Sequence, residues 1–394
     1  MTQPDRIYDV LIVGGGLVGS SCAIALAQQG IKVGLVDKRV LKAGDLANAP
    51  IDSRVYTITP GNAEWLRSLG VWERLDHNSI STIDDMEIWS DLDAEARAEA
   101  TLEFSAYGTN LPHLAFVLEE QVLQAALWST LDDTEVERVT GESVALEVGA
   151  KSARLHLADG TELQASLIVA ADGGNSAIRE LADIATRNHP YEQRGIVANF
   201  QTELPHGNIA RQWFTKNGVM AWLPLPGNRI SLVWSTKNAE YLLAMESADL
   251  AEKVAEEGAH LLGALSTITS PQSFSLALRT AEPMVRPRVA LVGDAAHQIH
   301  PLAGQGVNLG FRDVVTLVET FGQRKNVEDI GNYMLLRRYE RARKADLLEM
   351  QVLTHGLNLL FESEQPMVRS LRNWGMKALN YQSLLKRQLV RQAI

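Results

Sequence analysis

Apolar runs and a glycine-rich turn alternate over the first forty residues. Residues 8–13 (Tyr-Asp-Val-Leu-Ile-Val) form a short apolar run that predicts a buried strand. After the glycines, residues 20–29 favour a helix that ends at Gly30. Residues 32–36 favour a second strand, which ends on Asp37. This order of strand, glycine turn, helix, strand and acid predicts a dinucleotide-binding α/β unit.

The turn itself reads Gly14-Gly15-Gly16-Leu17-Val18-Gly19. Gly14 permits a tight turn, Gly16 lets the backbone approach a pyrophosphate, and Gly19 allows the helix to pack closely on the strand. The helix start would direct free N–H groups at the phosphates, which places Leu17 and Val18 beside the ligand. Asp37 would accept hydrogen bonds from an adenosine ribose and repel a 2′-phosphate. The alternative is a glycine turn without a ligand, and this unit does not distinguish NAD from FAD.

Two later apolar runs also end in an acid, and they favour FAD. Residues 167–171 are followed by Asp172-Gly173, and residues 289–292 by Gly293-Asp294. A second strand that ends in an acid suits a longer, bent ligand, whose ribityl hydroxyls Asp294 would bond. The helix that begins near Gly306 would aim its N–H groups and dipole at the flavin pyrimidine, where reduced flavin carries negative charge. For Asp172 the alternative is a cap on the turn into the next helix.

Residues 196–235 alternate in a pattern that predicts several strands. Aromatic side chains in this region could line a substrate pocket or pack in a core, and the pattern leaves both interpretations open. They are Trp213, Phe214, Trp222 and Trp234. His297 and His300 invite an acid–base role, but a histidine just after a strand more often hydrogen-bonds the backbone to hold a loop. We favour the loop-holding role.

The composition is that of a globular protein with two joined domains. The chain has 394 residues, 46% of them hydrophobic and 22% charged. Its single cysteine, Cys22, excludes an internal disulfide and a cysteine-rich zinc site, and we expect it to be a small packed residue. The formal net charge of −11 argues against nucleic-acid binding. Residues 10–31 lack charge over a length that could cross a bilayer, but glycines and two glutamines oppose a span, so we expect a cytoplasmic protein.

The C-terminal segment, residues 366–394, differs from the rest of the chain in charge. It contains six basic residues and no acidic one, so the preceding 365 residues carry a net charge of −17. Its leucines and tyrosine recur at helical spacing, with most basic residues off that face. This pattern predicts an amphipathic helix that docks at a membrane surface, peripheral to the inner membrane. The alternative is a helix packed on the acidic body or on a second copy of the chain.

Together these motifs resemble the single-component (group A) flavoprotein aromatic hydroxylases. The resemblance rests on the glycine turn, on Asp172-Gly173 and on the run from Gly293 to Asp313. Within that group, several stretches resemble the ubiquinone-biosynthesis hydroxylases. These stretches are residues 293–297, 301–310, 223–225, 231–234 and 339–346. The likeness covers essentially the whole chain.

The resemblance implies further site residues. Arg54 should face the flavin-side phosphates or the ring, and Gln121 should contact the nucleotide. Beyond the glycine turn, the expected cofactor contacts are Asp37, Arg54, Gln121, Asp172, Asp294, Pro301, Gly304, Gln305, Gly306 and Asn308. The expected substrate-side residues are Trp222, Leu223, Pro224, Leu225 and Leu302, with Pro301 beside them. Gly174 departs from the family by lacking a side chain, so we expect a looser turn after Asp172.

The family implies an FAD-dependent monooxygenase that hydroxylates the ring of a polyprenylated phenol or quinol in ubiquinone biosynthesis. NAD(P)H or another electron donor reduces the FAD, O2 adds to give a C4a-hydroperoxide, and the distal oxygen passes to the ring. Because water promotes loss of hydrogen peroxide, such a site needs apolar walls more than a catalytic side chain, and we assign neither a catalytic residue nor a metal ligand. We find no second dinucleotide fingerprint, which fits a transiently bound reductant. Other quinone-biosynthesis proteins and a second copy of the chain are candidate partners.

The expected fold is α/β: a Rossmann-like FAD-binding domain, an inserted sheet-rich substrate domain and a helical C-terminal tail. The FAD domain is expected from residues 1–75, 106–187 and 286–365, the substrate domain from 76–105 and 188–285, and the tail from 366–394. Two other interpretations stay open. One is another flavin enzyme of the same fold, such as a polyprenyl reductase or a halogenase. The other is a non-catalytic flavin-bearing subunit of a quinone-biosynthesis assembly.

Overall fold

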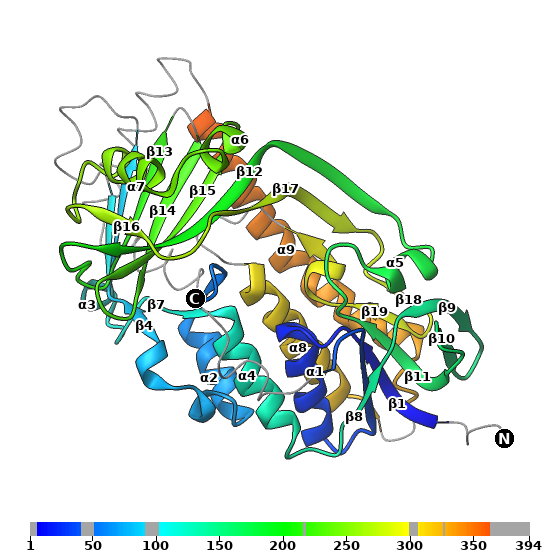
Figure 1. Cartoon of the computed structure of the whole chain (residues 1–394). Coiled ribbons are helices and arrows are strands. Elements are labelled where there is room, and N and C mark those ends of the chain that lie inside the picture. Colours follow the sequence, from blue (N-terminus) through cyan, green and yellow to red (C-terminus); the bar gives the residue numbers. More distant parts are fainter. Residues whose placement is uncertain are drawn as a thin grey trace.

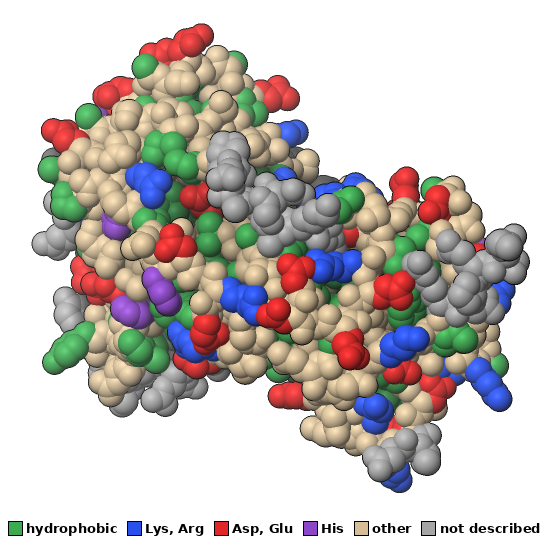
Figure 2. Space-filling model, turned by 60° about the horizontal axis from the view of Figure 1, so that its bottom comes forward, with side chains coloured by type: hydrophobic (Ala, Val, Ile, Leu, Met, Phe, Trp, Pro, Cys, Tyr) green, Lys and Arg blue, Asp and Glu red, His purple; other side chains and the backbone are tan. Residues whose placement is uncertain are grey.

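The computed structural model describes residues 6–40, 51–90, 102–215, 218–298, 306–325 and 328–362. These residues form two large sheets at opposite ends of the molecule, with helices beside and between them (Figure 1). In the space-filling view the outline narrows between two lobes, and acidic and basic side chains are interspersed on the face shown (Figure 2). The α/β fold expected from the sequence is confirmed.

The first sheet is built around strand β1 (Arg6–Val13), which pairs in parallel with β2 (Val33–Asp37) and β11 (Glu162–Ala170). These strands are apolar because both faces of the sheet are covered, and residues 10–13 are at most 6% exposed. The other members are β8 (Glu137–Thr140), β9 (Ser143–Val148), β10 (Ala153–Leu157), β18 (Val285–Arg286) and β19 (Val289–Leu291).

The parallel direction of four strands assembles the sequence motifs at one edge. β1, β2, β11 and β19 run the same way, so their carboxyl ends lie side by side. The glycine turn follows β1, Asp37 ends β2, Asp172 follows β11, and Gly293 with Asp294 follows β19. Open parallel sheets bind ligands at this edge. We call it the cofactor edge.

Helices pack on this sheet and on one another. α1 (Leu17–Gln28) packs against α4 (Glu120–Leu131) and α8 (Gly306–Gly322), and α8 packs against the long helix α9 (Tyr333–Glu362), orange in Figure 1. α2 (Pro60–Ser68) begins with a proline, and the hydroxyl of Thr59 accepts the N–H of Asn62 as its cap. Shorter helical segments are η2 (Trp72–Arg74), η3 (His77–Ser79), α3 (Ala106–Thr109), α5 (Ala177–Leu181) and η5 (Gly293–Ala295).

The second sheet is mainly antiparallel, and β5 and β13 are its parallel pair. Its strands are β5 (Asp85–Ser90), β6 (Leu102–Ser105), β12 (Thr186–Thr202), β13 (Ile209–Thr215), β14 (Gly218–Leu225), β15 (Arg229–Thr236), β16 (Leu265–Thr267), β17 (Gln272–Ala281) and β20 (His297–Gln298). Helices α6 (Ala239–Leu243) and α7 (Ser247–Glu257) lie beside it (Figure 1). A small sheet of β3 (Val55–Ile58), β7 (Ala115–Glu119) and β4 (Ser81–Ile83) also packs on it.

Alternating side chains give the second sheet two apolar faces. On the face toward α6 and α7, Trp213, Trp222 and Trp234 are each at most 2% exposed, in one cluster with Leu250 and Val254 of α7. We call this the helix-covered face. On the opposite face, Leu223 and Leu225 pack with Val117 of β7. The strand alternation of residues 196–235 therefore encodes two separate cores.

The proposed domain boundaries do not coincide with the sheets at every point. Strand β12 begins at Thr186, and β20 brings His297 and Gln298 into the second sheet, where they pair with Thr280 and Arg279. A segment assigned to the FAD domain thus also pairs with the substrate-domain sheet. The tail of residues 366–394 lies outside the described residues. No helix in the part of the chain that is described is both long and apolar enough to span a bilayer.

Candidate active site

The glycine turn has the geometry that its expected roles require. Gly14 has φ +107°, and a Cβ there would lie 2.3 Å from the carbonyl oxygen of Ala171. At Gly19 a Cβ would lie 1.8 Å from the carbonyl oxygen of Gly14, so α1 can pack here only without a side chain. A Cβ on Gly16 would meet no protein atom within 4 Å, which leaves open space in front of the turn. Leu17 is buried and the half-buried Val18 packs on the same core.

Asp37 is engaged by the protein on both of its oxygens. Oδ2 accepts the N–H of Gly15 at 2.7 Å, and Oδ1 accepts the N–H of Arg39 at 2.8 Å and its Nε at 3.1 Å. Burial alone would raise the pKa of Asp37, but the bonds to Arg39 and Gly15 lower it overall. The carboxylate is thus ionised and fixes the glycine turn, and Arg39 reduces its repulsion of a 2′-phosphate. Sequence reasoning missed Arg39 and also Trp128, whose Nε1 donates to Gly15 O at 3.0 Å.

Asp172 makes the cap that the sequence offered as an alternative, and it also leaves one carboxylate oxygen open to a ligand. Oδ2 accepts the N–H of Ile178 at 3.1 Å and so caps α5, while Oδ1 is buried with no hydrogen-bond partner among the described residues. Burial raises the pKa of Asp172, and Ser176 and Ile178 offset part of the rise. A buried carboxylate oxygen is costly to leave unpaired, so this atom marks a place for a ligand donor.

The turn after Asp172 is held more firmly than expected. Gly174 O accepts Nη2 of Arg179 at 2.8 Å and also a bond from Arg279. A Cβ on Gly174 would lie 2.3 Å from Nε2 of Gln298, so the Gln298 side chain occupies the space that a side chain at position 174 would need. The expectation of a looser turn is therefore wrong.

Asp294 presents its side chain from the cofactor edge. It is exposed to solvent, yet enough protein surrounds the carboxylate for desolvation to raise its pKa. Gln298 Nε2 lies 3.4 Å from Oδ2. Tyr56 of β3 faces the same region: burial raises its pKa first, and the charges of Glu120 and Asp294 raise it further. Tyr56 carried no motif in the sequence and was missed.

Arg54 and Gln121 lie near one another beside this edge. The Arg54 side chain is 64% exposed, and its Nη1 lies 3.5 Å from Oε2 of Glu120. Burial raises the pKa of Glu120, and Arg54 offsets part of that rise. Gln121 Nε2 donates to Oε2 of Glu119 at 2.8 Å. An exposed guanidinium held by one distant carboxylate can turn to a phosphate without breaking a close ion pair.

The side chain of Asn308 forms hydrogen bonds with other residues of the protein. Its Oδ1 accepts Thr59 N at 3.0 Å and Asn62 Nδ2 at 2.8 Å, and its Nδ2 donates to Thr57 O at 2.6 Å. Asn308 is 3% exposed. The side chain therefore ties β3 and α2 to α8, and a cofactor contact would fall to its backbone. α8 itself begins at Gly306, as the sequence predicted.

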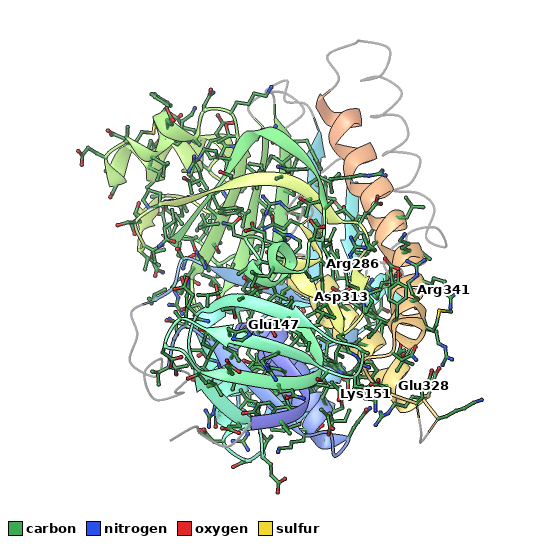
Figure 3. All side chains as sticks on the ribbon, turned by 90° about the vertical axis from the view of Figure 1, so that its right-hand side faces the viewer. Glu147, Lys151, Arg286, Asp313, Glu328 and Arg341 are labelled. Atoms are coloured by element: carbon green, nitrogen blue, oxygen red, sulfur yellow. The ribbon has the colours of Figure 1, made fainter. Side chains whose placement is uncertain are left out.

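We had favoured a bond from His297 to the backbone, but among the described residues its side chain bonds a carboxylate. Its Nε2 lies 2.7 Å from Oδ2 of Asp313, which also accepts Gly293 N at 2.8 Å. Oδ1 of Asp313 accepts Nε of Arg343 at 2.7 Å. These three side chains are at most 3% exposed, and Figure 3 shows Asp313, a residue of α8, well inside the molecule. Asp313 and Arg343 lie in stretches that carry the family resemblance, but the sequence assigned no role to either residue.

The expected substrate residues divide between the two faces of the second sheet. Leu223 and Leu225 lie on the face that packs against β7, whereas Trp222 lies on the helix-covered face. A Cβ on Gly258 would meet the Trp222 ring at 2.0 Å, which shows how tightly the ring is enclosed. The Trp222 side chain is thus placed in a core and does not suit a substrate contact. Pro224 is also buried.

Two unpaired polar groups share the face that carries Leu223. Asn199 of β12 and Ser231 of β15 are register partners, and both are fully buried. Asn199 Nδ2 donates to Asp52 O at 2.8 Å, which links this face to the segment that carries Arg54. Asn199 Oδ1 and Ser231 Oγ have no hydrogen-bond partner among the described residues. The pair lacked any sequence signature.

Several expected residues lie outside the described residues. They are Pro301, Leu302, Gly304, Gln305 and His300. Among the residues that are described, no group of three or more His, Cys, Asp or Glu side chains could hold a metal ion. Cys22 is buried, as expected, and burial raises its pKa to about 12.

Comparison with known proteins gives the family. Residues 7–350 match the family model described as an FAD binding domain. The chain is 35% identical to 3-demethoxyubiquinol 3-hydroxylase of Escherichia coli (strain K12), over 98% of each chain. It is 32% identical to the mitochondrial ubiquinone biosynthesis monooxygenase COQ6 of Homo sapiens, over 98% of this chain and 92% of that one. The chain belongs to the ubiquinone-biosynthesis hydroxylase family. The resemblance carried by the motifs is confirmed.

Solved structures agree on the fold of this ubiquinone-biosynthesis hydroxylase family member. The p-nitrophenol 4-monooxygenase PnpA from Pseudomonas putida DLL-E4 matches with a TM-score of 0.79 at 17% identity, over 99% of each chain. Klebsiella pneumoniae HpxO, complexed with FAD and uric acid, matches with a TM-score of 0.75 at 18% identity, over 98% of this chain and 96% of that one. The protein is an FAD-dependent monooxygenase.

The described residues fit FAD. Open space lies before Gly16, one oxygen of Asp172 is buried and unpaired, and Asp294 presents an accessible carboxylate at the same sheet edge. A dinucleotide that carries phosphates and many hydroxyl donors would satisfy each of these groups.

Proposed function

We propose that the enzyme hydroxylates the aromatic ring of a polyprenylated phenol or quinol intermediate of ubiquinone biosynthesis. The observation that carries the proposal is full-length similarity to relatives named for ubiquinone-biosynthesis hydroxylation. It is supported by a cofactor edge whose carboxylates and open glycine turn suit FAD. NAD(P)H or another electron donor and O2 are the co-substrates. Bound FAD supplies the activated oxygen that the ring accepts.

The residues of the chain bind FAD, orient the substrate and exclude water from the site of reaction. We assign FAD to Gly14, Gly16, Gly19, Asp37, Arg54, Gln121, Asp172 and Asp294, with the start of α8 at the flavin ring. Leu223 and Leu225 are themselves buried against β7, so they would form the layer beneath the apolar wall that excludes water from the reacting ring. Asn199 and Ser231 would take the phenol hydroxyl, because a phenol both donates and accepts a hydrogen bond and each residue has an unpaired polar atom.

Transfer of labelled oxygen tests the reaction class. The purified yellow protein is incubated with a short-chain prenyl phenol, NADPH or NADH, and isotopically labelled O2. One labelled oxygen atom in the product is expected by mass spectrometry. NADPH consumption with a saturated prenyl chain or a halogenated ring, and no labelled oxygen, would contradict the proposal. Deletion of the gene in its host should cause a quinone precursor that lacks one oxygen to accumulate.

We also propose that the basic segment 366–394 docks the enzyme on anionic membrane, where a polyprenylated substrate resides. The support is its charge of +6 against −17 in the rest of the chain. Each Lys or Arg near an anionic surface contributes about 1 kcal/mol. Co-sedimentation with anionic liposomes should be strong at low salt and weak at high salt. A chain truncated after Gln365 should lose it while retaining FAD, and equal binding by both chains would refute membrane docking by this segment.

A further inference from the structure

The turn that presents Asp294 is held from behind by one buried carboxylate. Asp313 Oδ2 contacts both ends of the turn: the N–H of Gly293 at 2.8 Å and Nε2 of His297 at 2.7 Å. Asp294 lies between these two contacts along the chain, and it is exposed. The orientation of Asp294 therefore follows from the position of Asp313.

The carboxylate of Asp313 is itself held in place by residues of α9. Arg343 Nε donates to Oδ1 of Asp313 at 2.7 Å, and Arg343 Nη1 donates to Asp346 at 2.6 Å. One helical turn earlier, Tyr339 Oη donates to Leu291 O at 2.8 Å, the last residue of β19. Figure 3 shows two sides of α9: Arg341 lies on the outer side of this helix, whereas Asp313 of α8 lies on its inner side. Three elements, β19, α8 and α9, thus meet behind the turn.

Backbone packing allows the turn little freedom. Gly293 has φ +59°, and a Cβ on Gly310 of α8 would lie 3.3 Å from the Cα of Gly293 and 2.6 Å from Val18. α8 and the turn therefore touch backbone to backbone. A displacement of Asp313 would move both the turn and the helix that starts at the flavin ring.

We propose that Asp313, His297 and Arg343 act as positioning residues that hold Asp294 against FAD and, through their balance of charge, set the pH below which FAD is released. The proposal rests on the proposed contact between Asp294 and FAD. We call these three residues the buried triad.

The charges behind Asp294 act on it in opposite directions. Burial raises its pKa, Gln298 and His297 lower it, and Asp313 raises it. Within the described chain, Tyr56 faces it from β3, and Arg179 of α5 donates to Ala295 O in the same turn at 3.0 Å. Arg343 compensates Asp313, whose own pKa is lowered by His297 and Arg343 although burial would raise it. Removal of Arg343 must therefore shift the pKa of Asp294 in a different direction from removal of Asp313.

The sign of each change follows from Coulomb's law. Arg343→Met leaves Asp313 less compensated, which raises the pKa of Asp294, so FAD is released at a higher pH than in the wild type. Asp313→Asn removes the repulsion and keeps the shape, so FAD is released at a lower pH. A merely structural role predicts the same direction for both, because either change weakens the packing of the turn.

The experiment measures release of FAD from the holoenzyme by flavin fluorescence from about pH 4 to about pH 8, a range that brackets ordinary and raised carboxyl pKa values. Shifts of about one pH unit in opposite directions are expected for Arg343→Met and Asp313→Asn. Arg343→Lys should restore the wild-type midpoint. Arg288→Met is the matched control, because Arg288 is also buried and bonded to Ser166 O and Asp329 but lies away from the turn.

Shifts in the same direction, or no shift, for Arg343→Met and Asp313→Asn would overturn the role of the buried triad. If Arg343→Met does not fold, His297→Gln replaces it, and a midpoint at higher pH is expected. Asp294→Asn separates the two proposals. A wild-type release profile in that variant would refute the Asp294 contact itself. Loss of FAD from that variant, together with unshifted triad variants, would refute only the role of the buried triad.

Discussion

The cofactor edge of the first sheet and the helix-covered face of the second both bury polar atoms without partners, but for different reasons. At the cofactor edge, one carboxylate oxygen of Asp172 has no hydrogen-bond partner among the residues that the structure describes. On the helix-covered face, the Nε1 atoms of Trp222 and Trp234 are unpaired within the described residues. Both observations concern buried atoms, yet only the first points to a ligand.

The free energies of burial explain why only the unpaired carboxylate points to a ligand. An unpaired buried N–H costs about 1–3 kcal/mol. A tryptophan that buries about 150–250 Å² gains about 4–6 kcal/mol at 25 cal/mol per Å², so the indole stays buried at a net gain. A carboxylate has little apolar surface to offset its cost. An unpaired carboxylate at a strand end therefore indicates a binding function, whereas an unpaired indole inside a core does not.

The largest expected effect is at the contact that builds the cofactor edge. Gly19→Val would place a branched side chain where a Cβ already lies 1.8 Å from Gly14 O. We expect loss of both the folded protein and FAD. In contrast, Gly16→Val faces open space and should lose FAD affinity while the apoprotein melts near the wild-type temperature. Calorimetry of both variants, with and without FAD, checks the contrast; equal destabilisation would make Gly16 a structural residue.

Next in size is a truncation on the helix-covered face. Trp213→Ala removes a ring that stacks on Trp89 with centroids 4.9 Å apart and contacts Trp222 at 4.7 Å. The free energy of unfolding should fall by about 3–5 kcal/mol. Denaturant titration measures this fall, and FAD affinity of the folded fraction should not change. A specific loss of FAD affinity in a stable protein would show that the two regions are not separate.

At the cofactor edge we expect a smaller effect of the opposite kind, in which FAD affinity falls and stability is kept. Asp294→Ala removes an exposed carboxylate, so stability should change little, while FAD affinity should fall by about 1.5–3 kcal/mol, the size of a hydrogen bond to a charged group. Isothermal titration with FAD gives the value. Wild-type affinity in this variant would remove Asp294 from the cofactor site.

The smallest effect on stability is expected for a variant on the other face of the second sheet. Ser231→Ala deletes a buried hydroxyl that has no partner in the described part of the chain, so stability should stay within about 1 kcal/mol of the wild type or rise. If the hydroxyl meets the phenol, kcat/KM and the fraction of NADPH coupled to product should fall. Ser143→Ala is the control, because its hydroxyl is also unpaired but lies on β9. Equal turnover in both variants would leave Ser231 without a substrate role.

Local patterns in the sequence predicted the elements and the ends of strands. The glycine turn, Asp172 and Asp294 each follow an apolar run within a few residues, so the motif and the strand that places it are read together. Contacts between distant segments have no such pattern. Trp128 bonds Gly15 across more than a hundred residues, and neither residue indicates the other.

The choice between core and pocket also depends on information beyond the local sequence. Trp222 and Leu223 are neighbours in β14 and were assigned together, but strand alternation sends them to different faces. Which face meets the cofactor depends on the partner layers, α7 on one side and β7 on the other. Likewise, His297 could be placed in a loop, but its bond to Asp313 depended on how α8 packs.

The anchorage of the cofactor edge by α9 has a consequence for the order in which the enzyme is made. Tyr339 and Arg343 secure β19 and Asp313, and they come after every expected cofactor residue in the chain. A ribosome that has synthesised the glycine turn and all three acids has not yet supplied the guanidinium that compensates the buried carboxylate of Asp313. We therefore expect FAD capture to follow the synthesis of residue 343, so that bound FAD would mark chains translated at least that far.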